Sequence, residues 1–194
     1  RIDDKQALVL DGSTSALIKG DLSNPELPKK HFTIESWVRI DEPLSWGGIV
    51  GAIQDNGSYE KGWILGFVDQ KFSFALNGNE GPDKLNYMTA DEDFILGQWY
   101  HLAATYDGSK MTLHVNGKVS ATSQEQSGEI QYPPNAYYEI GAYHDKDEHY
   151  FSKGMIHEVR VYHRALSLKE IKDHTQEVDF PIPELPAPVL ELAS

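Results

Sequence analysis

Apolar and polar residues alternate in short runs along most of this chain, a period of two that is typical of strands buried on one face. One face of residues 31–40 carries Phe32, Ile34, Ser36, Val38 and Ile40, and the other carries Thr33, Glu35, Trp37 and Arg39. The same pattern predicts further strands at 7–11, 15–19, 48–53, 62–68, 71–76, 84–89, 99–106, 110–115, 118–122, 137–143 and 155–162. The chain is therefore expected to be all-β.

Turn residues separate these runs. Asn116-Gly117 stands between two predicted strands and supplies the two positive-φ positions of a type I′ hairpin. Asp107-Gly108 marks a similar turn one strand earlier. Residues 99–122 are therefore predicted to form a three-stranded meander.

The C-terminal part of the sequence contains one helix signal and a proline-rich segment. Ser167 and Glu170 have the spacing of a capping box, which predicts a short helix that ends near His174. Four prolines follow within eight residues and favour an extended backbone: Pro181, Pro183, Pro186 and Pro188. We predict one domain over residues 1–179 and a linker or tail over residues 180–194.

Composition excludes several classes of protein. The 194 residues suffice for one hydrophobic core. They include 30 acidic and 17 basic residues, and the formal net charge of −13 repels phosphate backbones and anionic lipids. We therefore exclude nucleic acid and membrane surfaces as partners. The absence of cysteine excludes disulfides, thiolate zinc sites and cysteine nucleophiles.

Several motifs occur in a characteristic order: Ala7-Leu-Val-Leu-Asp-Gly12, Phe32-Thr-Ile-Glu-Ser-Trp-Val-Arg-Ile40, Trp99-Tyr-His-Leu-Ala-Ala-Thr-Tyr-Asp-Gly108, Leu113-His-Val-Asn-Gly117 and Gly154-Met-Ile-His-Glu-Val-Arg-Val-Tyr-His-Arg-Ala-Leu-Ser167. Together they resemble the laminin-G-like branch of the concanavalin A-like lectin/glucanase superfamily. The resemblance implies a two-sheet antiparallel jelly-roll sandwich with one short C-terminal helix. Members bind carbohydrates, bind protein partners or hydrolyse glycosides, so the fold does not choose among these functions.

A hydrolase of this superfamily would carry Glu-x-Asp-x-x-Glu on one strand. The one Glu-x-Asp here is Glu177-Val-Asp179, and Ile182 stands where the last glutamate belongs. Glycoside hydrolysis needs two carboxylates about 5 to 10 Å apart. We therefore expect no enzyme activity of this type.

Calcium is the cofactor that the resemblance allows. Asp11 matches the first calcium ligand of the family, His157 replaces the second, and Glu158 is the residue that would rebuild the site. The alternative for Asp11 is a turn residue whose side chain accepts hydrogen bonds from the nearby backbone before Gly12.

The segment His144-Asp-Lys-Asp-Glu-His149 fits no zinc-binding pattern. We interpret it as a charged loop, with calcium binding by Asp145 and Asp147 as the alternative.

Aromatic rings that stack on sugars are the candidate ligand contacts. Trp37 and Trp99 are expected to pack against the sheets, whereas the direction of Trp63 stays open. The candidates are Trp46, Tyr59, Tyr143 and Tyr150, and for each the alternative is to cover the rim of the core.

The leading hypothesis is a non-catalytic carbohydrate-binding or adhesion module of a larger extracellular, cell-surface or periplasmic protein. Its partners would be a glycan or glycosylated surface and the neighbouring domains of a longer chain. The first rival is a protein-interaction or spacer module without sugar binding. The second is a glycoside hydrolase or lyase with an unrecognised site, which predicts a groove with two facing carboxylates.

Overall fold

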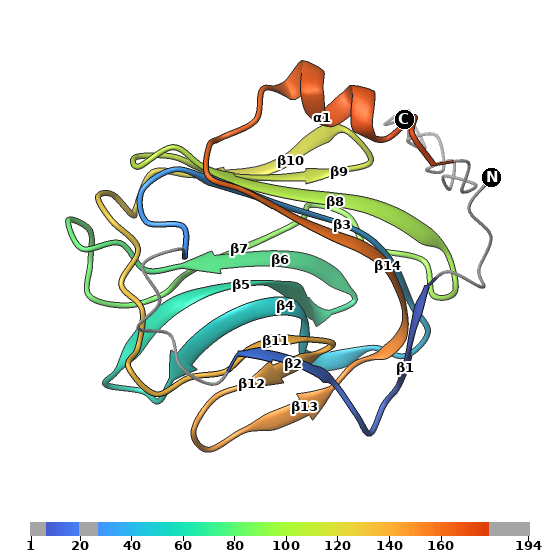
Figure 1. Cartoon of the computed structure of the whole chain (residues 1–194), viewed down its shortest axis with the longest axis horizontal. Helices are drawn as coiled ribbons and strands as arrows, with labels where there is room; N and C mark the ends of the chain where they lie inside the picture. Colours follow the sequence, from blue (N-terminus) through green and yellow to red (C-terminus); the bar gives the residue numbers. More distant parts are fainter. Residues whose placement is uncertain (1–6, 20–26, 179–194) are drawn as a thin grey trace, which may run out of the picture.

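The computed structural model describes residues 7–19 and 27–178, which form two antiparallel sheets stacked face to face (Figure 1). We call one sheet the helix-side sheet, because a short helix covers part of its outer face. Its strands have the order β1 (Leu8–Asp11), β14 (Lys153–Tyr162), β3 (Phe32–Ile40), β8 (Trp99–Tyr106), β9 (Met111–Val115), β10 (Lys118–Ser123). We call the other sheet the ribbon-side sheet, because a short two-stranded ribbon lies against its outer side. Its strands have the order β2 (Ala16–Lys19), β11 (Tyr138–Ile140), β4 (Leu44–Asp55), β5 (Glu60–Asp69), β6 (Lys71–Leu76), β7 (Asn86–Thr89). A two-stranded ribbon, β12 (Ala142–His144) and β13 (His149–Phe151), and one helix, α1 (Leu168–His174), complete the described elements. The predicted all-β jelly-roll sandwich with one short helix is confirmed.

The core lies between the two sheets and is built from the alternating faces that the sequence predicts. From β3, the side chains of Phe32, Ile34 and Val38 are fully buried. Phe32 meets Trp63 of β5 with ring centroids 5.2 Å apart. Trp63, whose direction the sequence left open, therefore points into the core, where its Nε1 donates to the hydroxyl of Tyr132 at 3.0 Å. Burial of each such side chain contributes about 1.5–3 kcal/mol.

The predicted strand at 137–143 is interrupted at Gly141. This glycine has a φ of +86°, and a Cβ there would lie 2.5 Å from Leu10 Cδ2. The chain consequently leaves the ribbon-side sheet after β11 and continues as β12, which pairs with β13. The sequence analysis did not predict β13, because three residues beside a charged turn are too short for a clear alternating pattern.

The ribbon lies against β4, on the outer side of the ribbon-side sheet (Figure 1). Gly48 makes this approach possible, since a Cβ at this position would lie 1.8 Å from the carbonyl oxygen of Ala142. Ser152 adds a hydrogen bond, because its hydroxyl donates to the carbonyl of Gly48 at 2.8 Å. Backbone atoms thus approach closely at Gly48, while the side chain of Tyr143 packs against Ile53 of β4.

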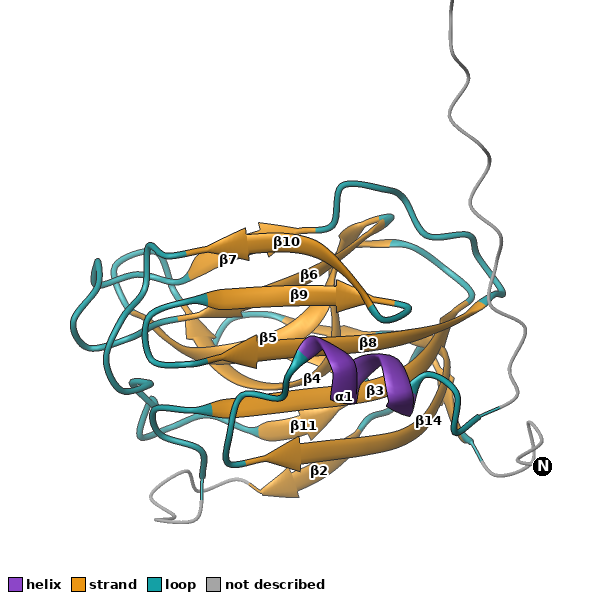
Figure 2. Cartoon of the chain, turned by 90° about the horizontal axis from the view of Figure 1, so that it is seen from above, coloured by secondary structure: helices purple, strands orange, loops and turns teal. Residues whose placement is uncertain are grey.

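The helix α1 covers part of the outer face of the helix-side sheet (Figure 2). Its predicted capping box is confirmed, because the Ser167 hydroxyl accepts from the Glu170 backbone and the Glu170 carboxylate accepts from the Ser167 backbone. Its buried residue Ile171 belongs to a cluster with Ala103 and Leu166. On the same side of the sheet, Trp37 and Trp99 pack with each other and with Val178, which confirms their structural role.

The predicted type I′ turn is also confirmed, since Asn116 and Gly117 have φ values of +50° and +72°. The proposed tail over residues 180–194 and the domain boundary at residue 179 lie outside the described residues and stay predictions. Within the part of the chain that the structure describes, no helix has the length and apolar character needed to cross a bilayer.

Replacing His114 with glutamine is expected to make the fold less sensitive to acid. His114 on β9 is 4% exposed, and burial, followed by the charge of Lys110, lowers its pKa from 6.5 to about 4. Because the unfolded chain binds a proton at this imidazole at a higher pH than the folded chain does, stability falls as the pH decreases from about 6.5 to about 4. Between pH 7 and pH 5, His114→Gln should therefore lose about 2 kcal/mol less free energy of unfolding than the wild type in urea titrations.

The exposed residue His163 supplies the control for this experiment. His163→Gln should keep the wild-type dependence of stability on pH. Equal slopes for the wild type and both variants would contradict the assignment of a buried neutral imidazole at position 114.

Candidate functional site

Four aromatic rings form a continuous series on the outer side of the ribbon-side sheet, and we call them the aromatic face: Trp46 (β4), Tyr87 (β7), Tyr143 (β12) and Tyr150 (β13). Ring centroids are 5.2 Å apart for Trp46 and Tyr87, 6.1 Å for Trp46 and Tyr143, and 6.0 Å for Tyr143 and Tyr150. Three of these residues are candidates from the sequence. The fourth, Tyr87, was missed, because its partners come from strands far away in the sequence.

A small apolar cluster supports the aromatic face. It contains Ile53, Ile64, Ala75 and Leu85, all buried, together with Tyr143. These side chains point away from the main core because alternate residues of a strand face opposite sides of the sheet, as Ile64 does beside the core residue Trp63. The rings therefore stand on a fixed base.

Asp55, at the end of β4, holds two of the rings in place. The hydroxyls of Tyr87 and Tyr143 donate to the same carboxylate oxygen of Asp55, at 2.8 and 3.3 Å. Burial raises the pKa of both tyrosines, and the neighbouring carboxylate of Asp55 raises each further. Both hydroxyls therefore remain protonated donors at neutral pH. The sequence analysis did not single out Asp55.

The rings differ in how much of their surface a ligand could reach. Tyr143 is 3% exposed, Trp46 and Tyr87 are half-buried, and Tyr150 is 39% exposed. The Tyr150 hydroxyl donates to Glu148 at 2.9 Å. Tyr150 and the accessible parts of Trp46 and Tyr87 are therefore the surfaces that the aromatic face offers to a partner.

Tyr59 lies on the neighbouring turn between β4 and β5 and is 42% exposed. Its described ring contact is with Lys61, whose Nζ lies 5.9 Å from the ring centroid, rather than with the aromatic face. A hydrogen bond of 3.2 Å from Asn56 to Asp147 connects this turn to the turn of the ribbon. Tyr59 is thus near the ribbon turn but outside the series of rings.

Asp11, the first calcium candidate, closes a turn. Its Oδ1 accepts hydrogen bonds from the backbone of Ser13 and Thr14 and from the hydroxyl of Thr14, at 2.8 to 3.0 Å. The hydrogen bond from the Ser13 backbone is the largest cause that lowers the pKa of Asp11 to about 2. The alternative turn role is therefore present in the structure.

Glu158, the residue expected to complete that site, lies elsewhere along β14. Asp11 pairs with Lys153, five residues before Glu158, which corresponds to about 16 Å along a strand. Glu158 is engaged by Arg160, with 2.7 Å between Arg160 Nε and the carboxylate. The structure does not bring Asp11 and Glu158 together around a shared ion.

Asp145 and Asp147 both lie in the turn of the ribbon. Asp145 is 2% exposed, and its Oδ1 accepts from the backbone of Asp147 and Glu148, each at 2.8 Å. Its Oδ2 is buried and has no hydrogen-bond partner among the described residues. This carboxylate oxygen is thus left unpaired among the described residues.

A third group of ligating side chains joins β11 to the ribbon. One carboxylate oxygen of Glu139 and one nitrogen each of His144 and His149 all lie within 4.8 Å of one another. The sequence analysis assigned no metal to these two histidines.

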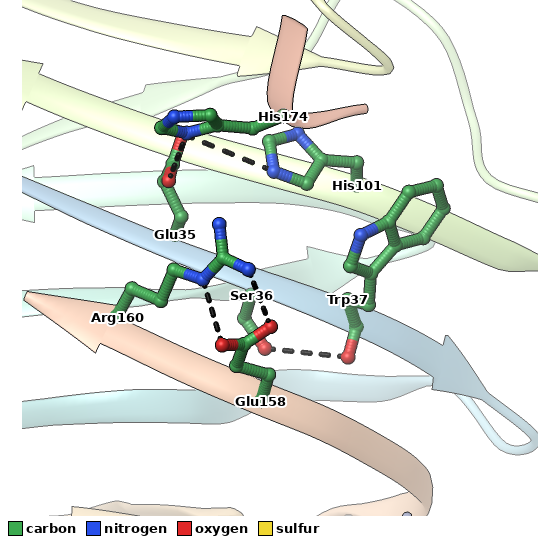
Figure 3. Close-up of a pocket in the computed structure, with 7 residues that line it drawn as sticks. All are labelled: Glu35, Ser36, Trp37, His101, Glu158, Arg160 and His174. Atoms are coloured by element: carbon green, nitrogen blue, oxygen red, sulfur yellow. Dashed lines mark hydrogen bonds and ion pairs between the residues drawn. The ribbon is translucent and has the colours of Figure 1, made fainter. Parts of the chain in front are cut away.

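A polar pocket lies on the outer side of the helix-side sheet (Figure 3). Two carboxylates line it, Glu35 and Glu158. Burial raises the pKa of Glu35 despite its contact with His174 Nδ1 at 2.9 Å, whereas the hydrogen bond from Arg160 lowers the pKa of Glu158. Opposite shifts of this kind occur in acid–base pairs of enzymes.

The size of this pocket argues against a sugar substrate. The cavity measures about 10 Å³, which is near the minimum for one water molecule. Arg160 forms ion pairs on this outer face with Glu158 and Glu177. It points outward because Val159 and Val161, one residue away on each side, pack against the core.

The sequence profile of the concanavalin A-like lectin/glucanases superfamily matches residues 11–172. The chain belongs to this superfamily. The expectation drawn from the sequence motifs is thereby confirmed.

Pappalysin-1 from Mus musculus is 34% identical over 140 residues, which is 66% of this chain and 8% of the relative. Human pappalysin-1 is 33% identical over the same extent. The chain thus spans a small part of the curated relatives that it matches.

Several solved structures share the fold of this chain. The CBM40 of the Ruminococcus gnavus IT-sialidase, bound to α2,3 sialyllactose, has a TM-score of 0.69 at 14% identity, over 88% of this chain and 96% of that chain. Domain 4 of AbnA, a GH43 extracellular arabinanase from Geobacillus stearothermophilus in complex with arabinotriose, has a TM-score of 0.66 at 19% identity, over 88% and 76% of the two chains. At these identities the likeness concerns the fold.

Removing the carboxylate of Asp55 is expected to destabilise the aromatic face. Asp55→Ala leaves the hydroxyls of Tyr87 and Tyr143 without their acceptor, which should lower the free energy of unfolding by about 1–3 kcal/mol in urea denaturation. Asp93→Ala is the control, because Asp93 forms an exposed pair with Lys71 at 3.4 Å, and such pairs contribute about 0–1 kcal/mol.

A second substitution tests the cause. Adding Tyr87→Phe to Asp55→Ala removes one unpaired hydroxyl and should recover part of the lost stability. If Asp55→Ala costs no more than Asp93→Ala, the two tyrosine hydroxyls do not depend on Asp55.

Proposed function

We propose that this domain is a non-catalytic carbohydrate-binding module and that the aromatic face is its glycan contact. The observation that carries the proposal is the series of four touching rings on one side of the sandwich, ending in the exposed ring of Tyr150. Rings of this kind stack on the apolar faces of sugars, and adjacent polar groups fix the hydroxyls. The superfamily membership and the sugar-bound structures with the same fold support it.

The charges near the aromatic face favour neutral glycans. Asp55 lies among the rings, while Asp147 and Glu148 lie in the adjoining turn. Carboxylates accept hydrogen bonds from sugar hydroxyls but repel an anionic sugar. The proposed ligand is therefore a neutral oligosaccharide rather than a sialylated one.

A structural calcium ion is part of the proposal at one place, the turn of the ribbon. The buried Oδ2 of Asp145 supports this position, and Asp147 lies two residues away. Calcium takes six to eight oxygen ligands, so backbone carbonyls and water would supply the rest. Such an ion would stiffen the turn that precedes Tyr150.

The module is proposed to act within a larger extracytoplasmic protein. The match to 8% of pappalysin-1 supports an arrangement in which neighbouring domains of a longer chain are its permanent partners. The glycan or glycosylated surface would then be the external partner.

A protein-interaction module is the second candidate, because Tyr143 is buried and Trp46 is half-buried. Rings that are already packed against each other offer less surface for stacking on a sugar. In this case the aromatic face would orient the ribbon for contact with another domain.

Glycan binding is testable with two substitutions on the aromatic face. Wild-type protein is screened on an array of neutral and sialylated oligosaccharides, and hits are titrated by calorimetry with calcium and with EDTA. Trp46→Ala and Tyr150→Ala should each weaken binding about tenfold, since an aromatic contact contributes about 0.5–1.5 kcal/mol beyond its buried area.

Tyr162→Ala is the matched control, because this half-buried tyrosine belongs to β14 in the opposite sheet. It should bind like the wild type. A wild-type protein that binds no glycan, or a Trp46→Ala/Tyr150→Ala double variant with unchanged affinity, would refute the proposal and favour the protein-interaction module.

A further inference from the structure

A compact group of two imidazoles and one carboxylate lies on the side of the ribbon that faces away from the aromatic face. His144 Nδ1 is 2.6 Å from one oxygen of Glu139, and His149 Nε2 is 3.2 Å from the other. Glu139 is 4% exposed, and the hydroxyl of Ser15 also donates to it. The three side chains therefore converge on one partly covered position.

The fold creates this group from three separate strands. Glu139 on β11 points outward, because Tyr138 and Ile140 on either side pack against the core. His144 and His149 are directly opposite each other in the ribbon, so their side chains share one of its faces. No local spacing motif links the three residues, which explains why a search for zinc patterns in the sequence did not find them.

We propose that Glu139, His144 and His149 bind a divalent transition-metal ion, with zinc as the first candidate. Two neutral imidazole nitrogens and a carboxylate oxygen are a common donor set for zinc and related ions. Zinc bonds of about 2.0–2.1 Å in tetrahedral geometry place neighbouring donor atoms about 3.3 Å apart. His149 lies 3.2 Å from one Glu139 oxygen and His144 lies 2.6 Å from the other, and one donor atom from each residue lies within 4.8 Å of the other two, so modest side-chain shifts bring the three donors to this separation.

A column of rings positions the two imidazoles. Tyr137 stacks on His144 with centroids 4.2 Å apart, His144 stacks on His149 at 3.6 Å, and Phe151 lies 4.0 Å from His149. The imidazole planes are nearly parallel, at 5°. Binding therefore requires one imidazole to tilt until both lone pairs point at the ion, and His149, with 34% of its side chain exposed, is the ring that can do so.

The electrostatics of the group favour a cation. Burial would raise the pKa of Glu139, but hydrogen bonds from Ser15 and His144 outweigh it, so the carboxylate is ionised. A metal ion would replace the proton between Glu139 and His144 and would add a third anchor at His149. Three protein ligands leave a fourth position for water.

A bound ion would fasten the ribbon to β11. The ion would cross-link β11, β12 and β13, which the backbone connects through the turn at Gly141 and the turn of the ribbon. This role is structural and does not require that the aromatic face binds a glycan, so failure of one proposal leaves the other standing.

Zinc binding by the full chain is measured by calorimetry after removal of metals with EDTA. The wild type should bind one zinc ion, and zinc chloride should raise its melting temperature, because a ligand that binds the folded state stabilises it. X-ray absorption of the zinc complex should show two imidazole ligands. Absence of binding at about 100 micromolar zinc would overturn the proposal.

Substitutions locate the ion. His149→Ala and Glu139→Gln should each weaken zinc binding by more than about 100-fold, since loss of outer-shell partners alone costs about 10–100-fold. His149 is exposed, so its removal tests the site even if Glu139→Gln disturbs folding. His163→Ala, at an exposed position outside the group, should bind zinc like the wild type. Wild-type affinity in His149→Ala would place the ion elsewhere and refute the assignment.

Discussion

The close backbone contact between the ribbon and β4 is the constraint on which both proposed sites depend. Gly48 leaves the space into which the carbonyl of Ala142 fits, and Gly141 supplies the left-handed turn that directs the chain there. A side chain at either position would collide with its neighbours, and one at Gly141 would also be strained by its positive φ. Because the ribbon carries Tyr143 and Tyr150 on one face and His144 and His149 on the other, both groups take their positions from this contact.

The two outer faces of the sandwich differ in their surfaces as a result. On the helix-side sheet, the pocket beside Arg160 measures about 10 Å³ and is lined by ion-paired side chains (Figure 3). Its two carboxylates, Glu35 and Glu158, lie in contrasting environments. On the ribbon-side sheet, the outer surface keeps an aromatic ring accessible at Tyr150 and an imidazole accessible at His149. Recognition is therefore expected on the ribbon side.

Local patterns in the sequence sufficed for the strands, a turn, the helix and part of the candidate site, whereas the two-sheet sandwich was implied by the family resemblance. The alternation in residues 31–40, the Asn116-Gly117 turn and the Ser167–Glu170 capping box each depend on neighbours in sequence, and each is present in the structure. Trp46, Tyr143 and Tyr150 could be selected as aromatic residues in or beside loops. Tyr87, Asp55 and the group around Glu139 could not, because long-range strand pairing brings their partners together, and a single glycine at position 141 decides where the ribbon begins.

The alternation of side chains in the ribbon also limits how this domain can change in evolution. Adding or removing one residue between Gly141 and Tyr143 would turn the tyrosine toward β11 and the neighbouring histidine toward Trp46, exchanging the two surfaces at once. The turn at residues 145–148 is less restricted in this respect, since a longer loop can keep the pairing of the two strands and therefore the directions of their side chains. Homologous domains are therefore expected to vary in length at this turn while keeping both ribbon strands free of insertions.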